Sequence, residues 1–182
     1  YVEMIGEIER AGVGRNISLK LTQLGLDVDR ATCVDNLRRI LDAAAPGQFF
    51  VRIDMENSPY TDATLDALET VWNIGYRSVG TVIQSCLKRS AKDVERLNAM
   101  GVRVRLVKGA YREPRDVAFQ QKADVDAAFV ELTHMLLQHG TYPAIASHDP
   151  AMIAATTTFA AQQHIPRDAF EFQMLYGIRR DL

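Results

Sequence analysis

The sequence Val-Arg-Val-Arg-Leu-Val-Lys at residues 102–108 combines the apolar residues of a buried strand with three cations. Side chains alternate between the two faces of a strand, so Val102, Val104 and Leu106 share one face, while Arg103 and Arg105 share the other. A buried parallel strand is expected to be almost continuously hydrophobic. Cations inside such a strand therefore indicate either a functional site or a structural ion pair.

Similar strand-like segments occur along the whole chain, separated by amphipathic stretches of helical period. This alternation is typical of βα units around a parallel sheet and predicts an α/β fold. The expected strands are residues 16–24, 49–57, 78–86, 102–109, 143–148 and 170–175. Helices are expected over 2–11 and between the strands, with N-terminal caps at Thr61, Ser90 and Asp149. We predict a single domain over residues 1–182. Residues 111–122 form the longest irregular segment, which is either an ordered loop over a site or a plain surface excursion.

Polar residues recur near the carboxyl end of the expected strands. They are Lys20, Asp54, Gln84, Arg105, Lys108, His148 and Gln173. A parallel barrel places its catalytic groups at this end of its strands, but an open doubly wound sheet also binds ligands there. The pattern therefore predicts where the site lies and leaves both folds open. The cationic excess favours an anionic ligand, such as a carboxylate, a phosphate or a reduced flavin.

The composition is that of an ordinary soluble globular domain. Of 182 residues, 47% are hydrophobic and 24% are charged, and the formal net charge is -2. These values exclude a disordered chain and a disulfide scaffold. The near-neutral net charge also argues against a protein that binds nucleic acid through bulk electrostatic attraction. Cys33 and Cys86 have no paired spacing, which predicts two free thiols in a reducing compartment. No apolar run approaches the ~20 residues that span a bilayer.

Several common catalytic motifs are absent from the sequence. It contains no P-loop, no HExxH and no GxSxG elbow. We predict no metal site. Gly109 and Ala110 follow Lys108, and such small residues allow a phosphate to approach the backbone closely.

Six segments in order along the chain resemble the successive motifs of the proline dehydrogenase family. They are Ser18-Leu-Lys-Leu-Thr-Gln-Leu-Gly-Leu26, Arg52-Ile-Asp-Met-Glu56, Val82-Ile-Gln84, Arg105-Leu-Val-Lys-Gly-Ala-Tyr111, Ser147-His-Asp149 and Phe170-Glu-Phe-Gln-Met-Leu-Tyr-Gly177. The resemblance implies a distorted (βα)8 TIM-type barrel and an FAD-dependent flavoprotein of proline catabolism. Such an enzyme oxidises L-proline to 1-pyrroline-5-carboxylate by hydride transfer to FAD and passes the electrons to a membrane quinone. It also implies a cytoplasmic enzyme that associates peripherally with the inner face of the membrane.

The resemblance also implies roles for individual residues. Lys20 matches a substrate-side lysine, and Asp54 and Arg105 match catalytic positions beside the substrate and the flavin. The positions that match cofactor-binding residues are Met55, Gln84, Arg105, Lys108, Gly109, Ala110, Tyr111, Ser147, His148, Gln173 and Leu175. Ser147 stands where the family usually has a threonine, so the hydroxyl group is kept.

The sequence departs from the family at both ends. The family's first strand and its C-terminal helix with paired arginines, which clamps the proline carboxylate, are not found, and Arg179 and Arg180 follow the last expected strand too closely to be that clamp. A complete barrel needs about 250 residues. We therefore expect about six βα units from the central part of a barrel, and we expect this chain alone to lack the substrate clamp.

Two alternatives to a flavoenzyme remain open from the residues. One is a non-redox barrel lyase in which Lys20 or Lys108 forms a Schiff base, which requires a lysine of depressed pKa in a dry pocket. The other is a catalytically silent fragment that keeps the polar residues.

Overall fold

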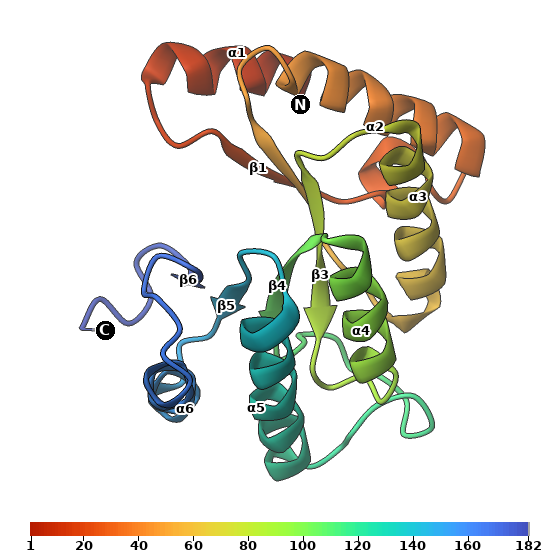
Figure 1. Cartoon of the computed structure of the whole chain (residues 1–182). Coiled ribbons are helices and arrows are strands. Elements are labelled where there is room, and N and C mark those ends of the chain that lie inside the picture. Colours follow the sequence, from red (N-terminus) through yellow and green to blue (C-terminus); the bar gives the residue numbers. More distant parts are fainter. Residues whose placement is uncertain (182) are drawn as a thin grey trace. The chain divides into compact units, whose positions relative to one another are not determined.

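Strands and helices alternate along the chain in the computed structural model, which describes residues 1–181 (Figure 1). The strands are β1 (Asn16–Leu19), β2 (Phe50–Ile53), β3 (Val79–Gln84), β4 (Arg103–Val107), β5 (Ala144–Ala146) and β6 (Glu171–Gln173). The helices are α1 (Val2–Ala11), α2 (Arg30–Ala44), α3 (Thr61–Ile74), α4 (Ser90–Met100), α5 (Lys122–His139) and α6 (Pro150–Gln162). Each expected strand is confirmed in place, and so is each expected helix.

The strand order is β1-β2-β3-β4-β5-β6, which is also the order along the chain. The β1–β2, β2–β3, β4–β5 and β5–β6 pairs are parallel. A doubly wound sheet reverses its strand order at a switch point, whereas a (βα)8 barrel keeps neighbours in sequence order. The fold is therefore α/β of the TIM-barrel type, with six βα units in the described residues.

The chain divides into two compact units, and each is described by itself. Unit 1 is Tyr1–Thr81 and unit 2 begins at Val82. In unit 1, β1 and β2 pair in the register Ile17↔Val51 and Leu19↔Ile53. The core of unit 1 is formed by apolar side chains of these strands and of α2 and α3, all fully or almost fully buried. They include Leu19, Leu37, Leu41, Val51, Ile53, Leu65, Leu68 and Val71.

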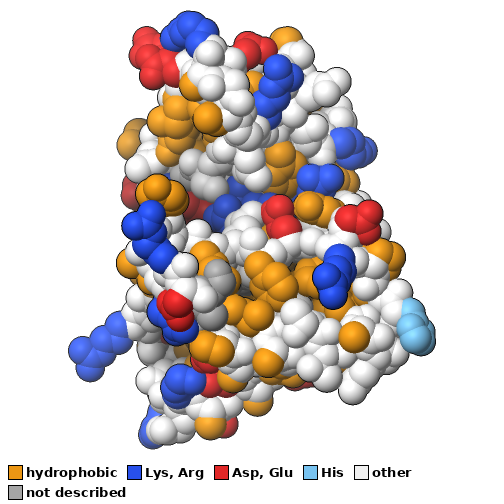
Figure 2. Space-filling view, turned by 90° about the vertical axis from the view of Figure 1, so that its left-hand side faces the viewer, with side chains coloured by type: hydrophobic (Ala, Val, Ile, Leu, Met, Phe, Trp, Pro, Cys, Tyr) orange, Lys and Arg blue, Asp and Glu red, His pale blue; other side chains and the backbone are white. Residues whose placement is uncertain are grey.

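In unit 2, α5 lies between α4 and α6 (Figure 1). Val104 and Leu106 of β4 are buried, as are Phe129 and Leu132 of α5. The alternation of buried and accessible residues along β4 confirms the face assignment made from the sequence. On the face of unit 2 seen in Figure 2, hydrophobic side chains are exposed among basic ones.

The strands are shorter than the sequence predicts. The prediction of a strand through Leu24 is wrong, because β1 ends at Leu19 and Thr22–Leu24 forms a 3-10 helix, η1. The amide of Leu24 donates to the carbonyl of Leu21 at 2.9 Å, and this turn buries both leucines without strand alternation. A second 3-10 helix, η2 (Ser58–Tyr60), follows β2 in the same way.

Two of the three expected helix caps are wrong. Thr61 and Ser90 are the first residues of their helices and do not cap them, since the N-cap positions are Tyr60 and Arg89. The Ser90 hydroxyl instead donates to the carbonyl of Gln84 at 2.6 Å. Asp149 does cap α6, because its carboxylate accepts from the amide of Ala151 at 3.0 Å.

Candidate active site

In unit 1, Lys20 and Asp54 are the residues that directly follow β1 and β2. Leu19 pairs with Ile53 in the sheet, so the next residue of each strand is Lys20 and Asp54. The amide of Asp54 donates to the carbonyl of Leu19 at 2.8 Å, which joins the two strand ends. Both side chains are half-buried. The structure thus brings a lysine and an aspartate to the carboxyl end of neighbouring strands, as predicted.

Two further residues of unit 1 support this end of the sheet. Met55, a predicted cofactor contact, is buried. Glu56 accepts from the Thr22 hydroxyl at 2.9 Å and from the Thr22 amide at 3.3 Å. The carboxylate therefore fixes η1, which starts two residues after Lys20. Glu56 was not predicted to be a site residue, although it lies two residues after Asp54 and therefore on the same face of an extended chain.

Arg52 is a buried cation in the middle of β2, with only 2% of its surface exposed. Its guanidinium carbon lies 4.8 Å from the centre of the Phe50 ring, and Nη1 donates to the carbonyl of Thr81 at 3.3 Å. These contacts compensate part of the cost of burying the charge. Arg52 therefore belongs to the polar interior of unit 1.

In unit 2, the structure brings Gln84 and Gly109 together. Gln84 ends β3 and is buried, and Gly109 has a φ angle of 110°. A Cβ atom at Gly109 would lie 2.4 Å from the Cys86 sulfur and 3.2 Å from Oε1 of Gln84. Only glycine fits this position. The next two residues, Ala110 and Tyr111, are exposed.

Arg105 on β4 and Gln173 on β6 are also in contact. Nε of Arg105 donates to Oε1 of Gln173 at 2.5 Å, and Nε2 of Gln173 donates to Glu171 at 2.6 Å. This contact spans β5, which lies between the two strands in the sheet. The amide of Leu175, in turn, donates to Nε2 of His148 at 2.9 Å, although the Leu175 side chain itself is 70% exposed.

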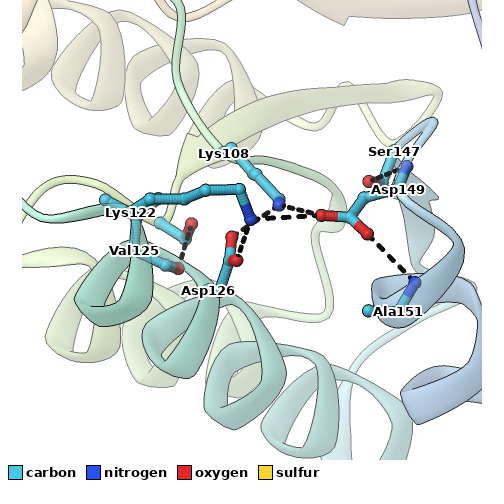
Figure 3. Close-up of polar contacts among 8 residues, drawn as sticks. Lys108, Lys122, Val125, Asp126, Ser147, Asp149 and Ala151 are labelled. Atoms are coloured by element: carbon cyan, nitrogen blue, oxygen red, sulfur yellow. Dashed lines mark hydrogen bonds and ion pairs between the residues drawn. The ribbon is translucent and has the colours of Figure 1, made fainter.

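Lys108, directly after β4, lies in a cluster of four charges (Figure 3). Its ammonium lies 2.5 Å from Oδ1 of Asp126 on α5 and 2.7 Å from Oδ2 of Asp149, the N-cap of α6. The Lys122 ammonium pairs with Asp126 and lies 3.5 Å from Asp149. The Ser147 hydroxyl accepts from the amide of Asp149 at 3.1 Å.

The cluster changes the acidity of its members. Hydrogen bonds from Lys108 and the amide of Ala151 lower the pKa of Asp149 to about 2. Hydrogen bonds from Lys108 and Lys122 lower the pKa of Asp126 as well. Both carboxylates therefore stay ionised at neutral pH. Asp126 and Lys122 were not predicted to be site residues, although their spacing of four residues is that of a helical ion pair.

Comparison with known proteins agrees with this arrangement of motifs. A family model described as proline dehydrogenase matches residues 2–182. The chain belongs to the proline dehydrogenase family. It is 40% identical over 178 residues to proline dehydrogenase 2 of Bacillus subtilis (strain 168), covering 98% of this chain and 58% of that protein. It is 40% identical over 185 residues to proline dehydrogenase of Deinococcus radiodurans, covering 100% of this chain and 60% of that protein.

Solved structures of proline utilization A share the proline dehydrogenase family fold of this chain. The structure from Bdellovibrio bacteriovorus, inactivated by N-propargylglycine, has a TM-score of 0.79 and 30% identity, and covers 88% of this chain and 20% of that one. A variant from Bradyrhizobium japonicum has a TM-score of 0.84 over 97% of this chain and 22% of that one; at 22% identity it shows the fold alone. This chain spans less than two thirds of the length of these relatives.

Proposed function

We propose that the protein to which this chain belongs is an FAD-dependent proline dehydrogenase, which oxidises L-proline to 1-pyrroline-5-carboxylate. The observation that carries the proposal is the set of polar side chains at the carboxyl ends of the strands in a chain of this family. Their positions are those at which a barrel holds its catalytic groups.

The residues of unit 2 fit a flavin. A side chain at Gly109 would collide with the Cys86 sulfur and with the Gln84 amide, so only glycine lets the backbone after Lys108 run this close to Gln84. Arg105 and Gln84 bring a cation and an amide that favour the negative charge of a reduced flavin. When bound, FAD supplies the two-electron oxidation.

The other roles follow from the chemistry of each side chain. Arg105, oriented by Gln173, would stabilise negative charge on the cofactor, and Gln84 would donate a hydrogen bond to it. Lys108, Gly109, Ala110 and Tyr111 would form one cofactor-binding segment, and Ser147 and His148 another, while Met55, Gln173 and Leu175 would line the cofactor. Lys20 and Asp54 of unit 1 would contact the substrate and orient it for reaction.

The finer parts of the proposal concern the electron acceptor and the location. We propose that the electrons pass to a membrane quinone and that the full-length protein associates with the inner face of the membrane from the cytoplasm. Within residues 1–181, no helix has the length and apolar character needed to cross a bilayer.

A Schiff-base lyase using Lys108 is disfavoured by the geometry of this residue. A Schiff-base lysine must present an unprotonated amine to its substrate. The Lys108 nitrogen instead donates to the carboxylates of Asp126 and Asp149. Both contacts direct N–H groups of Lys108 at protein carboxylates rather than at a substrate.

The proposal is tested with the full-length protein and with this chain, each supplied with FAD. We expect the full-length protein to show the flavin absorbance band and to reduce a redox dye in the presence of proline. Proline-dependent reduction that is absent from the FAD-loaded full-length protein would contradict the proposal. Covalent trapping of a substrate by borohydride at Lys20 or Lys108 would favour the lyase instead.

A further inference from the structure

Asp126 lies outside every segment that resembles a family motif, yet it contacts the lysine of one of them. It belongs to the first turns of α5, and its Oδ1 lies 2.5 Å from the Lys108 ammonium. Its other oxygen pairs with Lys122 (Figure 3). Only 21% of the Asp126 side chain and 25% of the Lys108 side chain are exposed, so the contact is largely shielded from water.

The Lys108 ammonium donates two of its three N–H groups to protein carboxylates. Asp126 approaches it from α5, and Asp149 approaches it from the N-terminus of α6. With Lys122, the cluster contains two cations and two anions, so its formal charge is zero. Lys108 therefore offers a ligand little uncompensated charge, and its ammonium instead links three segments of the protein.

The linked segments include both proposed cofactor-binding segments of unit 2. Lys108 begins the step that continues to Gly109 and Ala110, while Asp149 follows Ser147 and His148. The carboxylate of Asp149 is also fixed by the amide of Ala151. Asp126 ties Lys108 to α5, a helix packed against both α4 and α6, and Lys122 of the same helix lies 3.5 Å from Asp149. If the Asp126 carboxylate were displaced, the Lys108 ammonium would lose its contact with α5 and keep the one with Asp149.

We propose that Asp126 is a positioning residue, which holds Lys108 so that the 108–110 and 147–149 segments keep the spacing that the cofactor requires. This inference rests on the proposed FAD-dependent function. Lys122 has a smaller role because 75% of its side chain is exposed, and exposed ion pairs contribute little.

The test measures the dissociation constant of FAD by fluorescence quenching, with the full-length apoprotein that carries Asp126→Asn. The matched control is Asp124→Asn, which makes the same charge change at an exposed position in the first turn of the same helix. We expect the FAD dissociation constant to rise about tenfold in Asp126→Asn. A change of this size corresponds to the loss of one hydrogen bond to a charged group. In Asp124→Asn it stays within about twofold. An equal effect of both changes would overturn the inference.

A double-mutant cycle separates positioning from general stability. In a Lys108→Met background, Asp126→Asn should have no further effect on FAD affinity, because the group through which it acts is gone. The same tenfold loss in that background would contradict the inference. Asp126→Glu keeps the charge and should lose affinity about threefold, and it replaces Asp126→Asn in the cycle if that variant does not fold. If the unaltered protein bound no FAD, the proposed function itself would fail; if it binds FAD but Asp126→Asn equals its control, only the inference fails.

Discussion

Gly109 is the residue with the least freedom in the proposed site. Its φ angle of 110° is strained for any residue with a side chain, and the Cys86 sulfur lies only 2.4 Å from the position that a Cβ would take. Burial also raises the pKa of the Cys86 thiol, so this sulfur is a neutral packing group rather than a nucleophile. The close approach of Lys108-Gly109-Ala110 to β3 thus depends on a glycine and a small neighbour.

We expect Gly109→Ala to destabilise the full-length protein by about 2 kcal/mol or more, from backbone strain and overpacking. The measurement is urea unfolding of the four proteins of a cycle with Cys86→Ala. The penalty should be smaller in the Cys86→Ala background, because the sulfur that lies 2.4 Å from the new Cβ is removed. Equal penalties in both backgrounds would show that the thiol does not restrict this position.

Glu56 is a second residue whose role appears only in the structure. We expect Glu56→Ala to lower stability by about 1–2 kcal/mol, because the amide and hydroxyl of Thr22 lose their acceptor. Amide hydrogen exchange should become faster in η1, just after Lys20. Glu7→Ala is the control, since its ion pair with Arg10 is 75% exposed on both sides and should change stability little. A Glu56→Ala protein with unchanged exchange in η1 would refute this role.

At the scale of the elements, the strands are predictable from composition and their ends are not. Short runs of β-branched and large apolar residues identify all six strands, although burial alternates along β1 and β4 and is continuous along β3. Apolar residues continue past the end of β1 at Leu21 and Leu24, where a 3-10 turn buries them. Lys20, Asp54 and Lys108 consequently lie after their strands rather than within them. The spacing of Ser90 and Asp93 resembles that of a helix cap. The Ser90 hydroxyl donates its hydrogen bond to the carbonyl of Gln84 instead.

The contacts of the site were predictable only where they follow from the sheet. The parallel order places Lys20 beside Asp54 and puts His148 and Gln173 at the carboxyl end of neighbouring strands, whereas Arg105 lies in the middle of β4. The pairing of Lys108 with Asp126 was not predictable, because it depends on how α5 packs after an irregular segment of more than ten residues. Long-range side-chain contacts of this kind are set by tertiary packing.

The interface between α5 and α6 contains a titratable contact. His134 stacks on Phe159 with ring centres 3.7 Å apart, and burial lowers the pKa of His134. The unfolded chain therefore binds a proton more readily than the folded one, with an unfolded pKa of about 6.5. We expect the contribution of this stacked contact to the free energy of unfolding to be fully present above that pH and to be lost as the pH falls below it.

The measurement for this pH dependence is the urea midpoint of unfolding between about pH 8 and pH 5. His134→Phe keeps an aromatic stack and should flatten the dependence in this range. His139→Gln, at an exposed position in the last turn of α5, should leave the dependence as it is. A His134→Phe protein with the same pH dependence as the unaltered protein would assign the effect to other groups.

At the scale of the whole molecule, the order of the strands distinguishes a barrel from an open sheet. The sequence pattern is the same for both folds near the strand ends, so the choice required the pairing of neighbours in chain order. The chain spans 58% and 60% of two curated relatives. Tests of activity therefore belong to the full-length protein, with this chain measured beside it.

The most direct test of the proposed function is the anaerobic reduction of the bound flavin by proline, followed by stopped-flow absorbance. Arg105→Met in the full-length protein is compared with Arg103→Met, which removes a cation at the exposed start of the same strand. We predict that proline reduces the flavin in the unaltered protein and in Arg103→Met, and that Arg105→Met slows this step by about 100-fold or more while the protein remains folded. Reduction of the Arg105→Met protein by proline at the unaltered rate would contradict the account.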